Sequence, residues 1–416
     1  MRILILSDGF SAPAFKPRLR TLCDYLHAQG HTIEVYSEAS SPLSFRHEYP
    51  IEEVTLYSGS KWDWAVKNIA TMLFGWKERA FMRHVEKAIE GKPFDLVFCT
   101  SYYSFPLRAA TLIAHRRQIP CVLDLRDMVE QAPANQTLYL RHHSFFLTPF
   151  AHLYRYQNIR RRNRELQRAD AITTVSPWHV ELVRSITPKP CYLVYNGYDE
   201  TVFAPRDVQA DRFRIIYTGT VFPIPQQDPT LLFEALKRLD ISPDRLSVEW
   251  YTDAASNARV CRMAQQAGVE KWMNYHGLIS QQEIVPLLHE ASVCLVLTSR
   301  AGDQNGHGKM TTKFFEALGV EKPVLCVESD EECLAEVIRR TNAGLSATDT
   351  DQVVAFIREK YAEWEKQGFT RQAVETQQKK LFSRQTQARQ WEELFTETAE
   401  SPQTLPRAAH RPAFRG

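Results

Sequence analysis

The chain alternates short apolar runs with stretches of helical periodicity, and this alternation limits the folds open to it. Ile3 to Ser7 are apolar, and Leu19, Leu22, Cys23 and Leu26 follow at the i, i+3, i+4, i+7 spacing of a helix face. Further elements are expected as strands at 32–36, 95–100, 120–124, 171–175 and 191–195, and as helices near 106–117, near 145–168 and from 177. Such strand–helix–strand repeats predict a mainly parallel sheet covered on both faces.

A second series of the same kind begins at Arg214. It predicts strands at 214–219, 247–251, 273–276, 292–297 and 323–327, and helices at 229–239, 256–267, 281–290 and 331–340. A length of 416 residues suits two domains. We therefore expect two α/β domains, at residues 1–204 and 205–379, and a disordered tail at 400–416.

Composition and charge exclude several classes of protein. The formal net charge of +2 argues against a strongly basic nucleic-acid binder, although residues 1–205 carry 25 Lys and Arg against 20 Asp and Glu. The eight cysteines are scattered singly, as expected for reduced core residues of a cytoplasmic protein. The opening apolar run is too short for a signal peptide, and no run reaches the length needed to span a bilayer.

Ligands of open parallel sheets bind beyond the carboxyl ends of the strands, so residues that follow strands are the candidates for a site. Gly9 follows the first strand and would allow close backbone approach to a ligand, and Arg18 lies on the next helix, where it suits a phosphate or carboxylate. The pattern G-x-G-x-x-G is missing, which argues against a nicotinamide dinucleotide.

Charged residues also end the strand at 120–124. Asp124, Arg126 and Asp127 either line a cleft or form an internal ion pair that fastens the loop, and both can hold together. After the strand at 191–195, Asn196 and Gly197 predict an Asx turn with glycine at positive φ, and we expect no direct ligand contact there.

In the second half, Gly219 and Thr220 end the first strand, and their loop could receive a phosphate on its backbone amides. The richest segment is 300–318. It holds a glycine-rich loop with Gly306, Gly308 and Lys309, followed by a helix with Lys313 and Glu316 one turn apart on one face. Amides and lysines there would neutralise a diphosphate, and the carboxylate could accept both hydroxyls of a ribose.

This segment differs from a Walker A loop. The spacing of its glycines is wrong, and Met310 stands where Ser or Thr would hold magnesium. An ATPase is therefore not expected. Residues 142–164 mix aromatic residues with arginines, and they predict either a core helix with a solvated end or contact with an anionic membrane surface.

Taken together, these residues resemble the retaining glycosyltransferases of family 4, which have the GT-B fold of two Rossmann-like domains facing across a cleft. The resemblance covers nearly the whole chain. The matching stretches are Gly30-His31, Asp124–Asp127, Ala169–Ser176, Val194–Asp199 with Phe203, Tyr217–Gly219, Lys313–Leu318 with Lys322-Pro323, and Phe382–Arg384.

The resemblance implies roles for individual residues. In the second domain, Glu316 would hold the ribose, Lys313 and the amides after Gly306 the diphosphate, and Gly219 would approach the phosphates. In the first domain, Gly9, Arg18, Arg126 and Asp127 would line the acceptor side, and a helix near 380–398 would cross back to complete that domain. Two departures stand out: Gly308 replaces a glutamate common in the family, and Thr220 and Gln226 replace a basic pair.

The resemblance implies transfer of a hexose-type sugar from a UDP-, GDP- or ADP-linked donor to a glycan or lipid-linked acceptor. The pathway would be cell-surface polysaccharide biosynthesis, in the cytoplasm or peripherally at the inner membrane face. Asp127, Arg126 and Lys313 would act in catalysis, with no cofactor and no metal, and the sequence has no histidine cluster with ligand spacing. The alternatives are a sugar-nucleotide 2-epimerase and a catalytically degenerate partner subunit.

Overall fold

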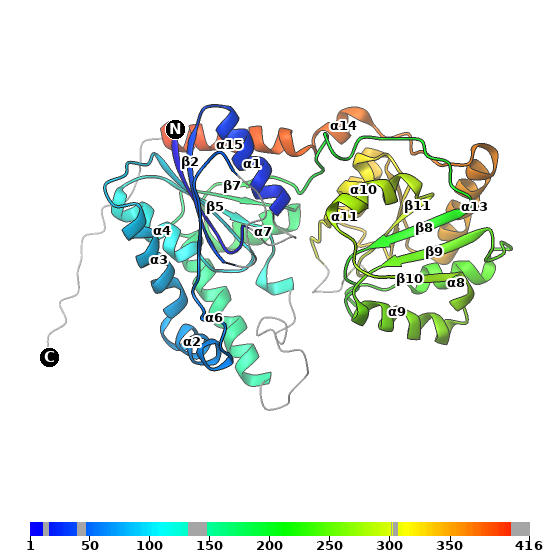
Figure 1. The fold of residues 1–416 in the computed structure, drawn as a ribbon, viewed down its shortest axis with the longest axis horizontal. Helices are drawn as coiled ribbons and strands as arrows, with labels where there is room; N and C mark the ends of the chain where they lie inside the picture. The colour runs from blue at the N-terminus through cyan, green and yellow to red at the C-terminus, as the bar shows by residue number, and fades with distance from the viewer. Residues whose placement is uncertain (11–15, 40–46, 132–147, 301, 303–306, 401–416) are drawn as a thin grey trace.

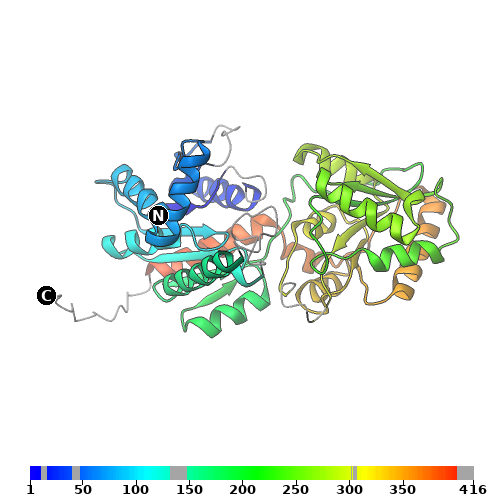
Figure 2. The ribbon, with the colours of Figure 1, turned by 90° about the horizontal axis from the view of Figure 1, so that it is seen from below.

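Two parallel sheets, each flanked by helices, form two lobes that lie side by side (Figures 1 and 2). The computed structural model describes residues 1–10, 16–39, 47–131, 148–300, 302 and 307–400. The tail predicted at 400–416 lies outside this part of the chain except for Glu400, which ends the last helix.

The first sheet has seven parallel strands in the order β3-β2-β1-β4-β5-β6-β7. Its strands are β1 (Arg2–Ser7), β2 (Thr32–Glu38), β3 (Ile51–Val54), β4 (Leu96–Ser101), β5 (Cys121–Leu125), β6 (Ala171–Thr174) and β7 (Cys191–Leu193). Its helices are α1 (Lys16–Ala28), α2 (Lys61–Phe74), α3 (Trp76–Ala88), α4 (Leu107–Arg117), α6 (Thr148–Leu166) and α7 (Pro177–Ile186), with a short 3-10 turn η1 (Val129–Gln131). Continuous apolar runs form the central strands because both sheet faces are covered.

The second sheet has six parallel strands in the order β10-β9-β8-β11-β12-β13. They are β8 (Phe213–Thr218), β9 (Leu246–Tyr251), β10 (Met273–His276), β11 (Val293–Leu297), β12 (Val324–Val327) and β13 (Gly344–Ser346). The helices are α8 (Thr230–Arg238), α9 (Ala254–Ala267), α10 (Gln281–Glu290), α11 (Thr312–Gly319), α12 (Cys333–Thr341), α13 (Thr350–Gln367) and α14 (Thr376–Lys380), with a 3-10 turn η2 (Glu270–Trp272). The predicted fold class, two parallel α/β domains, is confirmed.

Both strand orders reverse next to the first strand of the sheet, between β1 and β4 and between β8 and β11. Such a reversal leaves a crevice at the carboxyl ends of the strands, because the helices that follow the two strands lie on opposite faces. Asp8 and Tyr102 follow β1 and β4, whereas Gly219 and Thr298 follow β8 and β11. These loops are therefore the natural walls of a site.

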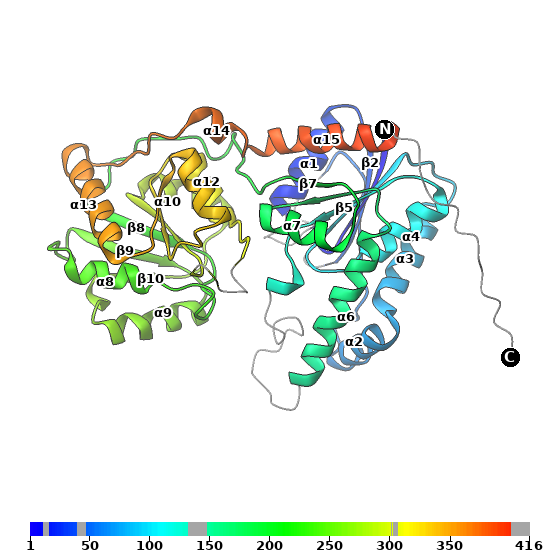
Figure 3. The same ribbon diagram turned by 180° about the vertical axis from the view of Figure 1, so that it is seen from behind.

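The last helix, α15 (Arg384–Glu400), packs on the first sheet although it follows the second in sequence (Figures 1 and 3). Trp391 is buried with Leu19 and Leu22 of α1, and its indole N–H donates to the Thr173 hydroxyl at 3.3 Å. Backbone hydrogen bonds join the two connections between the lobes, from Tyr198 N to the Phe382 carbonyl and from Arg384 N to the Tyr198 carbonyl. The chain thus passes twice between the lobes at one place.

Candidate functional site

A cavity of about 660 Å³ lies between the two lobes, with walls from both. Seven residues named from the sequence line it: Arg18, Arg126, Asp127, Gly219, Thr220, Gly308 and Glu316. A second cavity of about 220 Å³ is lined by Lys309 and Lys313. The two cavities share Tyr102, Asp127, Met310 and Thr311 as wall residues, so they are neighbouring parts of one site.

Two candidate residues named from the sequence, Gly9 and Gly306, are not among the residues that line these cavities. Gly9 is buried after β1, and its amide donates to the Ser7 hydroxyl at 3.3 Å, so it is not among the residues that line either cavity. The reason is that Asp8 turns back to the sheet, where it pairs with Arg126 and accepts from the Tyr102 amide. Gly306 lies outside the described residues.

Lys313 and Glu316 lie one turn apart at the start of α11, as their spacing predicted. The Lys313 ammonium lies 5.4 Å from the centre of the Tyr217 ring, and a Cβ built on Gly219 would stand 3.0 Å from Lys313 Cε. The φ of +89° at Gly219 favours glycine, and the end of the Lys313 side chain lies close over it. Thr311 precedes the helix without a side-chain capping hydrogen bond, so its hydroxyl does not occupy the first amides.

Burial shifts the protonation of both side chains. It raises the pKa of Glu316 to about 6, although Arg384 and Lys313 oppose the shift, and it lowers the pKa of Lys313 against the effect of Glu316. A site that strips water from a cation and a carboxylate in this way strengthens their interactions with a charged or polar ligand. Shifts of this kind are typical of functional sites.

The charges after β5 form both a wall of the cavity and an internal fastening. Asp124 is buried and structural: it accepts from the Thr100 and Thr173 hydroxyls at 2.8 and 2.7 Å and from Arg18 Nη2 at 3.1 Å. Arg126 forms an ion pair with Asp8. The two interpretations left open by the sequence hold together, since Arg18 and Arg126 are fixed by carboxylates and still line the cavity.

Asp127 differs from its neighbours because it faces both cavities. Burial raises the pKa of its carboxyl to about 7, and the positive charges of Arg126 and Lys309 only partly offset this. A carboxyl group that titrates near neutral pH can hold or release a proton under working conditions.

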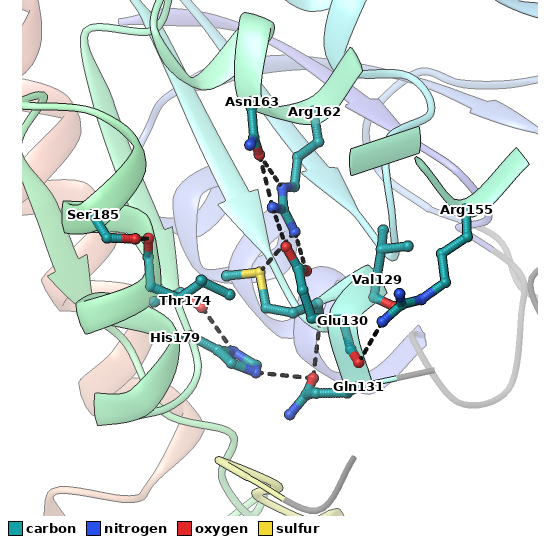
Figure 4. A network of polar contacts seen from close by, with 11 residues as sticks. Val129, Glu130, Gln131, Arg155, Arg162, Asn163, Thr174, His179 and Ser185 are labelled. Atoms are coloured by element: carbon teal, nitrogen blue, oxygen red, sulfur yellow. Dashed lines mark hydrogen bonds and ion pairs between the residues drawn. The ribbon is translucent and has the colours of Figure 1, made fainter. Parts of the chain in front are cut away.

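A buried chain of hydrogen bonds that the sequence did not predict links the lobes. Figure 4 shows the part of this chain in the first lobe, from Thr174 through His179 to Gln131. His179 Nδ1 forms a hydrogen bond with the Thr174 hydroxyl at 3.0 Å, and Nε2 donates to the Gln131 side-chain oxygen at 3.0 Å. The Gln131 amide then donates to the His307 carbonyl at 2.5 Å, in the loop of the other lobe. Burial lowers the pKa of His179 to about 3, so the ring is neutral near pH 7 and acts as a fixed donor and acceptor.

The same loop contacts the first lobe through apolar surfaces. The His307 ring stacks on Trp178 with centroids 5.9 Å apart, and a Cβ on Gly308 would stand 2.8 Å from the Ser176 hydroxyl. No side chain fits at Gly308, so the family's usual glutamate has no room in this arrangement. Two other basic side chains of this segment, His307 and Arg300, pair with Glu332 and Glu328, and neither is among the residues lining the two cavities.

The structure corrects the prediction of an Asx turn at Asn196 with Gly197 at positive φ. Gly197 does not have a positive φ; it is required because a Cβ there would stand 2.2 Å from the Phe382 carbonyl. The Asx turn is formed by Asp199, whose carboxylate accepts from the Thr201 amide, whereas Asn196 donates to the Met310 carbonyl of the other lobe. Asn196 and Gly197 also line the larger cavity, as do His179 and Arg384, which sequence reasoning did not assign to the site.

The described residues contain neither a candidate metal site nor a candidate membrane-spanning helix. No group of three or more His, Cys, Asp or Glu side chains there could hold a metal ion. Across the same part of the chain, no helix combines the length and apolar character that crossing a membrane requires.

Comparisons with known proteins agree with this architecture. A family model described as Glycosyltransferase Family 4 matches residues 18–202. The structure resembles sucrose-phosphate synthase from Thermosynechococcus elongatus with a TM-score of 0.68 at 13% identity, over 95% of this chain and 98% of that one. It also resembles the Anabaena protein HepE in complex with UDP, with a TM-score of 0.65 at 14% identity, over 95% and 100% of the two chains.

A glycosyltransferase from Rickettsia africae matches with a TM-score of 0.63 at 12% identity, over 96% of this chain and 99% of that one. No curated protein sequence matches the chain. At these identities the structural likeness establishes the fold, and the family model adds the sequence relationship over the first lobe. Residues 18–202 therefore match glycosyltransferase family 4, and the whole chain has the GT-B fold of the glycosyltransferases that it resembles.

Proposed function

We propose that the protein transfers a hexose-type sugar, with retention of configuration, from a nucleotide-sugar donor to a hydroxyl of a glycan or lipid-linked acceptor. The observation that carries this proposal is the placement of Lys313 and Glu316 on one helix at the interdomain site, with Gly219 against the lysine. HepE was solved with UDP and with UDP-glucose, which supports a nucleotide-linked donor. Biosynthesis of cell-surface polysaccharide in the cytoplasm belongs to the same proposal.

Breaking the anomeric bond places negative charge on the departing diphosphate and positive charge on the sugar. The ammonium of Lys313 and the first amides of α11 would stabilise the diphosphate, and the Glu316 carboxylate would accept the ribose hydroxyls. In a front-face reaction the diphosphate oxygen accepts the acceptor proton, so no protein nucleophile is needed. Arg126 and Asp127 stand on the opposite wall, where they would hold the acceptor, and metal independence stays a prediction.

A thermal-shift screen with UDP, GDP and ADP tests the proposal. A ligand that binds only the folded protein stabilises it by about 2.7 kcal/mol at a hundred times its Kd. We expect one of the three diphosphates to raise the unfolding temperature clearly more than the other two, and the matching sugar nucleotide to do so as well. Absence of any shift up to millimolar ligand would contradict a nucleotide-sugar donor.

The alternative of a sugar-nucleotide 2-epimerase shares the fold. A Listeria monocytogenes protein assigned as a UDP-N-acetylglucosamine 2-epimerase matches with a TM-score of 0.58 at 11% identity, over 96% of this chain and 97% of that one. Incubation with donor alone separates the two reactions: an epimerase makes a new sugar nucleotide, whereas a transferase gives slow hydrolysis or no product. A degenerate partner subunit would turn over no donor at all.

Replacing Gly219 with alanine is expected to weaken diphosphate binding several-fold. Its φ of +89° strains any L-residue by about 1–2 kcal/mol, and the new methyl group would also push Lys313 from its position. Gly268→Ala is the matched control, since Gly268 has a φ of +71° but nothing within 4 Å of the added carbon. Calorimetric affinities for the diphosphate found in the screen would reveal the difference; equal affinities for both variants would contradict the role of Gly219.

A further inference from the structure

Helix α2 turns its polar face toward the protein. The Lys67 ammonium donates to the Leu56 carbonyl at 2.9 Å, and Thr71 is buried with its hydroxyl on the Lys67 carbonyl. Arg161 of α6 donates to the carbonyls of Thr71 and Met72 at 3.2 and 2.9 Å. The contacts that hold α2 in place are therefore mostly polar.

The opposite face of α2 is apolar and exposed. Trp62, Val66, Ile69 and Leu73, which we call the α2 stripe, follow the i, i+4, i+7, i+11 spacing of one helix face. Their exposed fractions are 82%, 62%, 56% and 59%. A surface helix of a globular protein normally buries such a stripe against the core. In α2 the apolar face is instead exposed to solvent, and the polar face packs on the protein.

Helix α6 extends this surface with apolar and basic side chains. Figures 1 and 3 place α2 beside α6, and the hydrogen bonds from Arg161 of α6 join the two helices. Phe150, Leu153 and Tyr156 of α6 are about half exposed. Two arginines of this helix, Arg160 and Arg164, are exposed, and the Arg160 guanidinium lies 5.6 Å from the Tyr156 ring. The other three arginines of the helix make hydrogen bonds within the protein. Aromatic and cationic groups thus stand together on this side.

We propose that the α2 stripe and the exposed residues of α6 dock onto an anionic lipid surface. A helix of 14 residues is too short to span a bilayer, for which about 20 are needed, but it can lie in the interface with its apolar face buried. Tryptophan and arginine favour that depth, and arginines attract anionic head groups. The sequence suggested membrane contact through 142–164, of which 142–147 lie outside the described residues; the structure adds α2, which that suggestion did not include.

Charge favours a lipid over a second copy of the chain as the occupant. A twofold dimer formed through this face would place the same patch of each copy against the other, and with it the exposed Arg160 and Arg164 of both copies. Anionic head groups instead neutralise those arginines while the acyl region accepts the stripe. The occupant we infer is therefore a membrane interface rich in acidic lipid.

Vesicle co-sedimentation of the full chain tests this inference. We expect the protein to bind vesicles of phosphatidylcholine with about 30 mol% phosphatidylglycerol, and Ile69→Asp with Leu73→Asp to weaken partitioning at least tenfold. The matched control is Tyr192→Ser, which removes a similarly exposed apolar side chain from β7 and should change partitioning less than twofold. Arg160→Gln with Arg164→Gln should reduce the preference for these vesicles over pure phosphatidylcholine.

Circular dichroism and thermal melting verify that each variant folds. If the Ile69→Asp, Leu73→Asp variant melts at a lower temperature than wild type, the milder variant Val66→Ser with Leu73→Ser takes its place. Wild-type protein that ignores the vesicles, or an aspartate variant that binds them like wild type, would overturn the inference. A dimer seen by ultracentrifugation, dissociated by the same substitutions and indifferent to vesicles, would assign the stripe to a second copy. No donor or acceptor enters this assay, so its failure leaves the proposed transfer reaction standing, and the reverse holds too.

Discussion

Lys313→Ala and Glu316→Ala are each expected to weaken binding of the nucleoside diphosphate at least tenfold, or about 1.4 kcal/mol. Both side chains are half-buried at the interdomain site, so each loses less solvation than an exposed group when a ligand arrives. Lys313 would lose its charge contact with the diphosphate, and Glu316 its hydrogen bonds to the ribose. Isothermal titration calorimetry measures both affinities.

Exposed residues of the same types provide the controls. Lys366→Ala at the end of α13 and Glu393→Ala on α15 remove the same charges from the surface and should leave the affinity unchanged. The pKa of Glu316, about 6, adds a second test. The affinity of the wild-type protein should fall as the pH drops below about 6, because a protonated carboxyl group is a poorer acceptor of hydrogen bonds from the ribose hydroxyls. In Glu316→Gln this decrease should disappear. Unchanged affinity in both alanine variants would refute the assigned site.

Asp127→Asn is expected to lower kcat by roughly a hundredfold or more, the usual cost of removing a group that handles a proton or orients a reactant. Asp127 faces both cavities with a pKa of about 7, so a carboxylate requirement would make wild-type activity rise as the pH passes through about 7. The variant should lack this limb of the pH profile. Steady-state rates between pH 5.5 and 8.5 would show it.

Stability gives the independent readout for Asp127. The folded pKa of about 7 exceeds 3.8, the ordinary value for an aspartate, so between these values the folded state binds more protons than the unfolded state. The contribution of Asp127 to the free energy of unfolding therefore decreases as the pH rises from about 4 to about 7. Asp127→Asn should melt at a higher temperature than wild type at pH 8 by roughly 2–4 °C, the equivalent of about 1 kcal/mol, and show no such gain near pH 4. Equal melting at both values would contradict the buried carboxylate.

The strands and helices in which apolar residues are regularly spaced were predicted well from the sequence. The strands at β1, β4, β5, β8 and β11 differ from their expected ranges by one or two residues, because central strands covered on both faces must be apolar throughout. The edge strands β3 and β13 and the helices α2, α3 and α13 were not identified. β3 contains two glutamates in four residues, so it gives no strand pattern that could be recognised.

The site was partly predictable for a similar reason. Lys313 and Glu316 are close in sequence, and helical spacing alone puts them on one face. The link from Gln131 to the His307 carbonyl joins residues 176 positions apart, and Arg384 reaches the cavity only because α15 returns to the first lobe. Such contacts leave no local signature, since each residue alone reads as an ordinary polar residue after a strand or at a helix start.

The sequence by itself determined the two parallel α/β domains and the placement of Lys313 and Glu316 one helical turn apart. Alternating buried strands and a helical repeat are local consequences of burial and backbone geometry. The tertiary structure alone decided why Gly197 and Gly308 are glycines, since the atoms that exclude a Cβ there come from Phe382, Ser176 and Trp178. It also decided which way α2 faces: an amphipathic pattern fixes that a helix has two sides, whereas the polar anchors on α6 and Leu56 choose which side meets water.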